Sequence, residues 1–273
     1  MKKTRPLFPQ KLRVLVTALV GVVGCGLLLS AFVRDVAVPC APAGGGATAE
    51  MQLGAILHYA TSRVVPQQSM AEIRVSFDSL RSLSPCNLLV FGLGHDSLMW
   101  ASFNPRGTTL FLEEDPKWVQ TVLKDAPSLR AHAVRYRTRL SESDDLLKSY
   151  RSEPDCFPNK SFLRGNDGCK LALTGMPNEV YDKEWDMIMI DAPRGYFPEA
   201  PGRMAAIYSA AVMARNRKGS GVTHVFLHDV NRRVEKLYAE EFLCKKHLVK
   251  AEGRLWHFEI PPAANVSAGP KFC

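Results

Sequence analysis

The stretch Asn87-Leu-Leu-Val-Phe-Gly-Leu-Gly-His-Asp-Ser97 joins a strand-like apolar run to a glycine-rich turn and then to a helix-like segment. A short apolar run that ends at glycine is typical of a buried strand. Glycines after such a strand let backbone amides approach a ligand, and the following helix directs its positive end toward the same place. The stretch therefore predicts the first βα unit of an open α/β sheet, with a ligand site at the carboxyl end of the strand.

Strand-like and helix-like runs alternate after this unit, as is typical of parallel βαβ construction. The expected strands are 87–91, 108–112, 131–136, 185–190 and 223–227, and the expected helices are 97–103, 116–124, 143–150, 203–215 and 232–243. Two further strand-like runs, 247–251 and 254–260, meet at a short glycine-containing turn, which indicates a hairpin with one antiparallel strand. We expect a doubly wound, mostly parallel, seven-stranded Rossmann-like sheet with an antiparallel C-terminal hairpin.

The N-terminal region carries a membrane-targeting pattern. Val14 to Val33 is an uncharged apolar run that is long enough to cross a bilayer as a helix. A cleaved signal peptide also has a basic start and an apolar run, but its apolar core is usually shorter than this one. The basic residues before the run are Lys2, Lys3, Arg5, Lys11 and Arg13. Because basic residues favour the cytosolic side, we expect a cytosolic basic tail at 1–13, a transmembrane anchor at 14–33 and a lumenal remainder.

Composition suggests where the folded domain begins and ends. Pro39 to Ala49 is a Pro/Gly/Ala tract, so we expect a flexible lumenal stem at 34–68. Ser69 and Glu72 have the spacing of a capping box, which predicts a helix and the start of a folded domain at 69–262. A polar insertion is expected at 151–170 and a C-terminal tail at 263–273.

The cysteines and sequons fit an oxidising compartment. Six cysteines follow the apolar run and allow fifteen pairings. Cys156 and Cys169 bracket a short polar loop, so we predict a disulfide between them and leave the other pairings open. Asn159 and Asn265 each begin an Asn-x-Ser sequon, which predicts glycosylation. No ligand spacing along the chain resembles a known zinc motif.

The positive charge of the chain reflects membrane topology more than nucleic-acid binding. The net charge is +8, and part of it lies before the apolar run. We therefore predict no nucleic-acid partner. A modestly basic lumenal domain favours an acidic substrate, because a cleft of one sign concentrates ligands of the other.

Five residues after the first two strands are candidates for binding a cofactor: Gly92, Gly94, Asp96, Glu113 and Glu114. An acidic side chain about twenty residues beyond the glycine turn can accept hydrogen bonds from ribose hydroxyls, and Glu113 is the first choice for this role. A tight turn with Asp96 as the helix N-cap would explain the glycines without any ligand. Ser97 stands where a dinucleotide fingerprint has its third glycine, which disfavours a nicotinamide-dependent oxidoreductase.

Polar residues also follow the fourth and fifth strands. Asp191, His228 and Asp229 are expected to meet, because neighbouring strands lie roughly 5 Å apart. A sugar hydroxyl reacts when a base or a metal assists loss of its proton, so these three are candidate catalytic residues and the two aspartates are candidate metal ligands. For each aspartate alone, a turn-forming role explains the residue equally well.

Two arginines are candidates for binding the substrate. Arg194 and Arg232 follow the same two strands, and a planar guanidinium fits the carboxylate of a uronic acid. The alternative for each is a solvated surface arginine.

Four motifs together resemble the plant glucuronoxylan 4-O-methyltransferase family: Phe91-Gly-Leu-Gly-His-Asp-Ser97, Thr109-Leu-Phe-Leu-Glu-Glu-Asp115, Asp191-Ala-Pro-Arg-Gly-Tyr196 and His228-Asp-Val-Asn-Arg-Arg233. The resemblance runs from about Met70 to Phe258. It implies a class I methyltransferase fold with S-adenosylmethionine as methyl donor and a divalent metal ion as a second cofactor. It further implies transfer to O-4 of glucuronic acid on glucuronoxylan during xylan biosynthesis in the cell wall.

The resemblance also implies a setting and leaves alternatives open. The setting is the Golgi membrane, with a single-pass type II chain, a lumenal catalytic domain and other xylan-synthesis enzymes as partners. Relatives that act on arabinogalactan make methylation of glucuronic acid on arabinogalactan an alternative. A non-catalytic member of a xylan-synthesising assembly is another, and a metal-dependent methyltransferase of small phenolics is a third.

Overall fold

The computed structural model of the chain describes residues 46–158, 162–263 and 271–273. The expected tail 1–13, the expected anchor 14–33 and the sequons at Asn159 and Asn265 lie outside the described residues. Among the residues that are described, no helix combines the length and apolar character that a bilayer crossing requires. Residues Ala47–Cys273 form one compact unit.

One seven-stranded sheet organises this unit, in the order β3-β2-β1-β4-β5-β7-β6. The strands are β1 (Asn87–Phe91), β2 (Thr108–Glu113), β3 (Ala131–Ala133), β4 (Met187–Ile190), β5 (Thr223–Leu227), β6 (Leu248–Glu252) and β7 (Leu255–Ile260). The first five strands pair in parallel, and β7 is antiparallel to both β5 and β6. The predicted doubly wound sheet with one antiparallel strand is confirmed, although β3 ends three residues before the predicted end.

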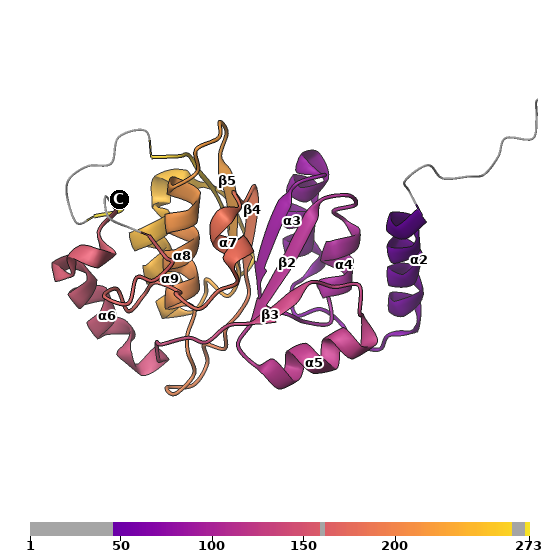
Figure 1. Ribbon diagram of the computed structural model, residues 1–273, viewed down its shortest axis with the longest axis horizontal. Coiled ribbons are helices and arrows are strands. Elements are labelled where there is room, and N and C mark those ends of the chain that lie inside the picture. Colours follow the sequence, from indigo (N-terminus) through magenta and orange to yellow (C-terminus); the bar gives the residue numbers. More distant parts are fainter. Residues whose placement is uncertain (1–45, 159–161, 264–270) are drawn as a thin grey trace, which may run out of the picture. The chain divides into compact units, whose positions relative to one another are not determined.

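Helices cover both faces of the sheet. The α-helices are α2 (Gly46–Thr61), α3 (Met70–Leu83), α4 (Ser97–Ser102), α5 (Pro116–Asp125), α6 (Ser143–Ser149), α7 (Asn178–Asp182), α8 (Met204–Arg215) and α9 (Arg233–Tyr238). Figure 1 shows α8 and α9 on one side of the sheet and α3, α4 and α5 on the other. The chain order of these elements alternates strand and helix, so consecutive parallel strands are joined by crossovers on either face.

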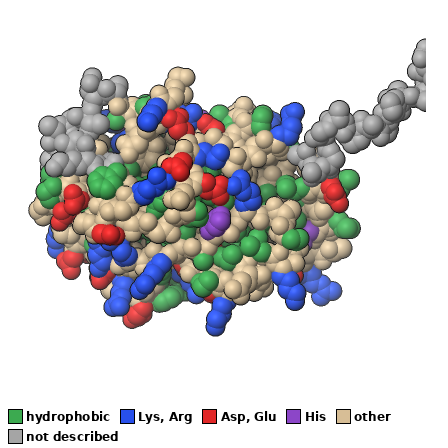
Figure 2. All heavy atoms as spheres, viewed as in Figure 1, with side chains coloured by type: hydrophobic (Ala, Val, Ile, Leu, Met, Phe, Trp, Pro, Cys, Tyr) green, Lys and Arg blue, Asp and Glu red, His purple; other side chains and the backbone are tan. Residues whose placement is uncertain are grey.

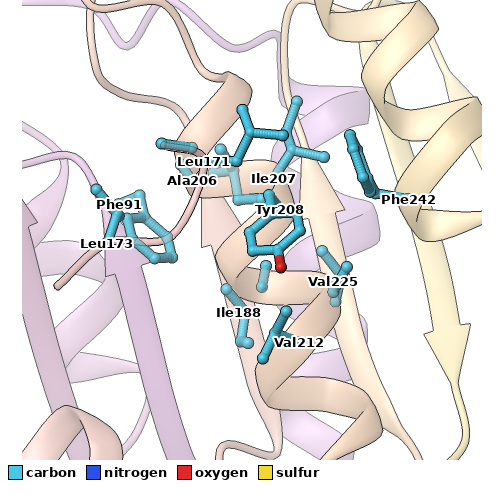
Figure 3. Packing of buried hydrophobic residues seen from close by; sticks show 14 of the residues in the cluster. Phe91, Leu171, Leu173, Ile188, Ala206, Ile207, Tyr208, Val212, Val225 and Phe242 are labelled. Carbon is cyan, nitrogen blue, oxygen red and sulfur yellow. The ribbon is translucent and has the colours of Figure 1, made fainter. Parts of the chain in front are cut away.

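Two apolar clusters fill the space between sheet and helices. The larger cluster lies on the α8 side, where Tyr208 lies edge-on to Phe242 and shares the cluster with the strand residue Val225 (Figure 3). Helix α8 is buried on almost every side, since α9, the following π-helical turn Ala239–Leu243 and the segment 163–176 all join this cluster. A helix that is apolar all round is expected to be enclosed in this way.

The predicted helix starts follow from side-chain capping. The Ser69 hydroxyl accepts the Glu72 N–H, and the Glu72 carboxylate accepts the Ser69 N–H, so the predicted capping box at the start of α3 is confirmed. Asp115 caps α5 by accepting the Lys117 N–H at 2.9 Å.

On the face that Figure 2 shows, acidic and basic side chains are interspersed.

Helix α2 corrects part of the predicted flexible stem at 34–68. Ala, Glu, Met, Gln and Leu favour a helix over 49–60 and outweigh the glycines before them. The helix is held to the domain by Tyr59, whose hydroxyl donates to the His95 carbonyl at 2.6 Å and accepts the Met99 N–H at 3.2 Å. The stem prediction therefore fails over α2 because it weighed composition and not these contacts.

The polar insertion and the end of the chain are fastened by disulfides. Cys156 is bonded to Cys169, as the loop between them predicts, and Cys244 is bonded to Cys273. Among the described residues the one free cysteine is Cys86, which is buried. The predicted tail 263–273 therefore ends against the domain.

Phe272 provides a test of how this chain end contributes to stability. Its ring is 8% exposed and lies edge-on to Tyr208 and Phe242, at centroid distances of 5.5 and 5.2 Å. Phe272→Ala is expected to lower the free energy of unfolding by about 3 kcal/mol, because it leaves a cavity in the larger cluster. Urea denaturation of the oxidised protein measures this loss.

Lys271→Ala is the matched control, since the neighbouring side chain is exposed and should change stability by less than about 0.5 kcal/mol. Equal stability of the two variants would contradict the expected role of Phe272.

Candidate active site

A cavity of about 420 Å³ opens at the carboxyl ends of β1, β2, β4 and β5. This is within the range of roughly 300 to 1,000 Å³ that small-molecule sites occupy. Its walls include all ten residues that were assigned to cofactor, catalysis or substrate: Gly92, Gly94, Asp96, Glu113, Glu114, Asp191, Arg194, His228, Asp229 and Arg232. The strand-end rule therefore brings every one of these residues to one place, while their roles stay predictions.

The glycine turn after β1 needs its glycine for two reasons. Gly92 has φ +129°, a backbone conformation that side chains rarely adopt, and a Cβ there would lie 3.3 Å from the Ala192 Cβ. Its N–H donates to the Leu112 carbonyl at 2.8 Å, which fixes the turn against the end of β2. A larger residue at this position would push apart the loops that follow β1 and β4.

Asp96 behaves differently from the simple cap that its position suggests. Its side chain makes no capping hydrogen bond and instead accepts the Trp100 indole N–H at 2.8 Å. Burial raises the pKa of the Asp96 carboxyl. Asp96 thus stands at the predicted N-cap position of α4, but the indole one turn later takes the carboxylate that would otherwise cap the helix.

Glu113 and Glu114 form an acidic pair at the end of β2. The Glu113 carboxylate accepts the Leu93 N–H at 3.0 Å and the Asp115 N–H at 3.2 Å. Burial, together with the adjacent Glu114, raises the pKa of Glu113 to about 7. Glu114 accepts the Arg194 N–H at 3.1 Å through Oε1, whereas its buried Oε2 accepts no hydrogen bond from an N–H or alcohol group among the described residues. Such a buried acceptor calls for a donor, which the protonated Glu113 carboxyl supplies in the free protein and a hydroxyl-bearing ligand would supply when bound.

Asp191 presents the more accessible carboxylate at the opposite end of the cavity. Its side chain is 31% exposed, against 2% for Asp229. Oδ1 lies 2.9 Å from His228 Nδ1 and Oδ2 accepts the Gln68 amide N–H at 3.1 Å. Burial favours the neutral acid, but the His228 hydrogen bond and the Arg203 charge outweigh it and lower the pKa of Asp191. The carboxylate is thus held ionised and pointed at the cavity.

His228 is buried beneath Asp191. The ring is 1% exposed, and its Nε2 lies 3.8 Å from the Glu72 carboxylate without a hydrogen bond among the described residues. Because Nδ1 is engaged by Asp191, the geometry suits a residue that positions Asp191 better than one that touches a substrate. The predicted catalytic role of His228 stays a prediction.

Asp229 does not fit the predicted metal site. Ligand atoms of Asp191, His228 and Asp229 lie within 4.8 Å of one another, as a shared ion requires. The Asp229 carboxylate, however, is paired with three guanidinium groups, each at 2.9 Å: those of Arg203, Arg232 and Arg254. A divalent cation here would be repelled by these charges and would find both carboxylate oxygens occupied. We assign no step to a metal at this position.

The two predicted substrate arginines differ in how free they are. Arg232 is 30% exposed and is engaged by Asp229 at 2.9 Å and by Glu235 at 3.5 Å. Arg194 is 50% exposed and lies 3.5 Å from both Glu114 and Asp115. Exposed pairs at this distance are weak, so Arg194 is the more available of the two for an incoming carboxylate.

Three side chains that were not predicted from the sequence also shape this site. Arg203 bridges Asp191 and Asp229, Gln68 holds Asp191 from the segment before α3, and Arg254 reaches Asp229 from the β6–β7 turn. A charged residue at the head of the apolar run 204–214 was a visible signal for Arg203. Gln68 and Arg254 gave no local signal, because their partners are distant in the sequence. The partner of Gln68 lies 123 residues away, and the partner of Arg254 lies 25 residues away.

The strand order, the glycine turn after β1 and the acidic end of β2 together define the class of Rossmann-like methyltransferases. The IRX15/IRX15L/GXM family model matches residues 71–258, and the chain belongs to this family.

The chain is similar to several proteins of Arabidopsis thaliana. Arabinogalactan O-methyltransferase 1 is 62% identical over 94% of this chain and 94% of that protein, and Arabinogalactan O-methyltransferase 2 is 58% identical over 95% and 94%. Glucuronoxylan 4-O-methyltransferase 2 is 50% identical over 80% of this chain and 74% of that protein. A solved methyltransferase-like protein from Silicibacter pomeroyi is 16% identical over 73% of this chain and 90% of its own, with a TM-score of 0.38.

The arginine cluster around Asp229 predicts a large stability effect. Asp229→Asn keeps the shape and the tolerance for φ +61°, but removes the charge that three arginines share. The free energy of unfolding should fall by about 3 to 5 kcal/mol, because those charges lose their partner in a buried setting. Denaturant unfolding measures the change.

Asp144→Asn is the matched control, since Asp144 pairs with Arg233 at 2.9 Å on the exposed surface. Its loss should be below about 1 kcal/mol. Similar losses in both variants would refute the idea that the cluster depends on Asp229.

Proposed function

We propose that this protein transfers a methyl group from S-adenosylmethionine to a hydroxyl of glucuronic acid on arabinogalactan. The observation that carries the proposal is 62% identity with Arabinogalactan O-methyltransferase 1 over 94% of both chains. The glucuronoxylan 4-O-methyltransferases are 49 to 51% identical over 76 to 80% of this chain. These figures favour arabinogalactan over the glucuronoxylan acceptor that the motifs suggested.

The donor would lie across the glycine turn and the acidic pair. When bound, S-adenosylmethionine supplies an electrophilic methyl group on a sulfonium sulfur. Glu113 and the buried Glu114 Oε2 are acceptors suited to the two ribose hydroxyls, and the Gly92 turn lets the chain approach closely. The residues at this end of the cavity therefore fit the donor.

Asp191 would bind the acceptor hydroxyl and accept its proton. Its carboxylate is the accessible one, and its lowered pKa keeps it ionised and able to accept a hydrogen bond from the hydroxyl. Asp191 would take up the hydroxyl proton as the acceptor oxygen gained the methyl group that the bound donor would supply, with the donor leaving as S-adenosylhomocysteine. Arg194, half-exposed at the cavity, is placed to meet the uronate carboxylate.

The setting is part of the same proposal. The disulfides Cys156–Cys169 and Cys244–Cys273 require an oxidising compartment, which supports a lumenal domain. With the apolar run at 14–33 as an anchor, we place the reaction in the Golgi lumen on a type II membrane protein.

The acceptor is tested with the full chain in detergent and methyl-labelled S-adenosylmethionine. Arabinogalactan oligosaccharides that carry glucuronic acid should be methylated with a kcat/KM at least about 10-fold above that of glucuronoxylan oligosaccharides, since the site discriminates by transition-state contacts. Oligosaccharides whose uronic acid has been reduced to glucose are the matched acceptor control and should take up little label.

Asp191→Asn is the inactive reference, expected to lose roughly 100-fold or more in kcat while still binding S-adenosylhomocysteine. Preferred labelling of xylan would overturn the acceptor assignment. Donor binding without transfer to either polysaccharide would favour the non-catalytic alternative, and label on a small phenolic would favour the third.

Glu113 predicts how donor affinity depends on pH. Below about pH 7 the carboxyl of the free protein is protonated, because burial and Glu114 raise its pKa. Ribose hydroxyls donate to the ionised form, so donor binding lowers this pKa and releases a proton. Affinity for S-adenosylhomocysteine should therefore rise with pH up to about 7 and then level off, by at most about tenfold per pH unit. Calorimetry between pH 5.5 and pH 8.5, roughly spanning this range, measures the curve.

Glu114→Gln removes the neighbouring charge that helps to raise the Glu113 pKa, so the same rise should occur at lower pH. A pH-independent affinity, or a curve that this variant does not move, would argue against Glu113 as the ribose acceptor.

A further inference from the structure

A second group of metal-ligating side chains lies on the sheet away from the cavity. His224 is on β5, and His257 and Glu259 are on the neighbouring β7. In the antiparallel register His224 stands opposite Glu259, and Phe226 stands opposite His257. Directly opposed residues share a face and so do residues two apart on a strand, so all three ligating side chains project from one face.

The separations suit a single small cation. His224 Nδ1 lies 3.0 Å from His257 Nε2 and 3.8 Å from Glu259 Oε1, and all three ligand atoms lie within 4.8 Å of one another. Zinc–nitrogen bonds of about 2.0 to 2.1 Å in a tetrahedral site place two ligand nitrogens roughly 3.3 Å apart. The imidazoles would need to separate by a few tenths of an ångström and the glutamate to swing inward.

The two rings are held in place by stacking. The His257 ring stacks on Phe226 at a centroid distance of 4.1 Å, and the two histidine rings stack at 5.2 Å.

Access and charge also suit a cation. His224 is 16% exposed and Glu259 is 42% exposed at its side chain, so an ion and a water ligand can reach the group from solvent. The positive charge that acts on His224 is that of Arg217, whose guanidinium is engaged by Asp186 at 2.8 Å. The hydrogen bond between the two imidazoles, at 3.0 Å, is the contact that a bound ion would replace.

We propose that His224, His257 and Glu259 bind one zinc ion, with water as the fourth ligand. His224 precedes His228 by four residues, which places the ion roughly 13 Å from the cavity along the strand. The ion therefore takes no part in methyl transfer. It ties β7 to β5, and the β6–β7 turn in turn carries Arg254, a partner of Asp229.

Two different sites could make the activity of this protein depend on a metal ion. Loss of activity on chelation would ordinarily be attributed to the aspartates at the strand ends, but three arginines already occupy Asp229. A zinc ion at β5 and β7 would make the protein sensitive to chelators through stability. Zinc binding and thermal unfolding measure this independently of whether the proposed function is correct.

The test uses the full chain in detergent, stripped with EDTA, dialysed and titrated with zinc chloride. Once zinc has been added back, the wild type is expected to hold one zinc ion per chain by elemental analysis. Its midpoint of thermal unfolding should rise with the zinc concentration. Glu259→Gln and His224→Gln should each bind zinc at least about 10-fold more weakly, because each removes a direct ligand. Circular dichroism of both variants without zinc verifies that they are folded.

Two controls make the result specific. Glu252→Gln removes a half-exposed carboxylate from the same hairpin, where it pairs with Lys250, and Asp191→Asn removes the other candidate group. Both should bind zinc as the wild type does. The proposal is overturned if the wild type binds no zinc, or if Asp191→Asn abolishes binding while Glu259→Gln and His224→Gln do not.

Discussion

The buried guanidinium of Arg203 is the interaction on which the site depends. It lies 3.1 Å from Asp191 and 2.9 Å from Asp229, and it donates to the His228 carbonyl at 2.8 Å. An unpaired charge at this depth would be prohibitively unfavourable, so the arginine and the two carboxylates stabilise each other only together. Because Arg203 is the N-cap residue of α8, the packing of that helix in the larger apolar cluster places the guanidinium at the ends of β4 and β5.

The same constraint extends to the C-terminal hairpin. Asp229 has φ +61°, a strained conformation for a residue other than glycine, and surrounding contacts must hold it there. Arg254 supplies one such contact from the β6–β7 turn, and its backbone N–H also donates to Glu72 at the start of α3. The antiparallel pair therefore completes the site as well as the sheet, which links the hairpin to the placement of the candidate catalytic residues.

Periodicity and glycine placement predicted the sheet because they report local burial. The strand 87–91 and the turn at Gly92 needed no knowledge of distant partners. Contacts between distant segments were not predictable in this way: Arg254 meets Asp229 only after the hairpin folds back, and Tyr59 of α2 accepts the N–H of Met99, 40 residues further along the chain. Likewise, nothing in the spacing of His224 and His257 indicated a shared site, since strand pairing brings them together.

The two ends of the cavity shift the pKa of a carboxyl group in opposite directions, and this difference supports different roles for the two ends. At the β2 end, burial and a like charge raise the pKa of Glu113, and the buried Glu114 Oε2 calls for a donor, so this end favours neutral hydroxyl donors. At the β4 end, His228 and Arg203 overcome burial and keep Asp191 ionised. Environments that push carboxyl pKa values apart assign different tasks to chemically similar residues. The donor ribose belongs at the first end, and the hydroxyl that loses its proton belongs at the second.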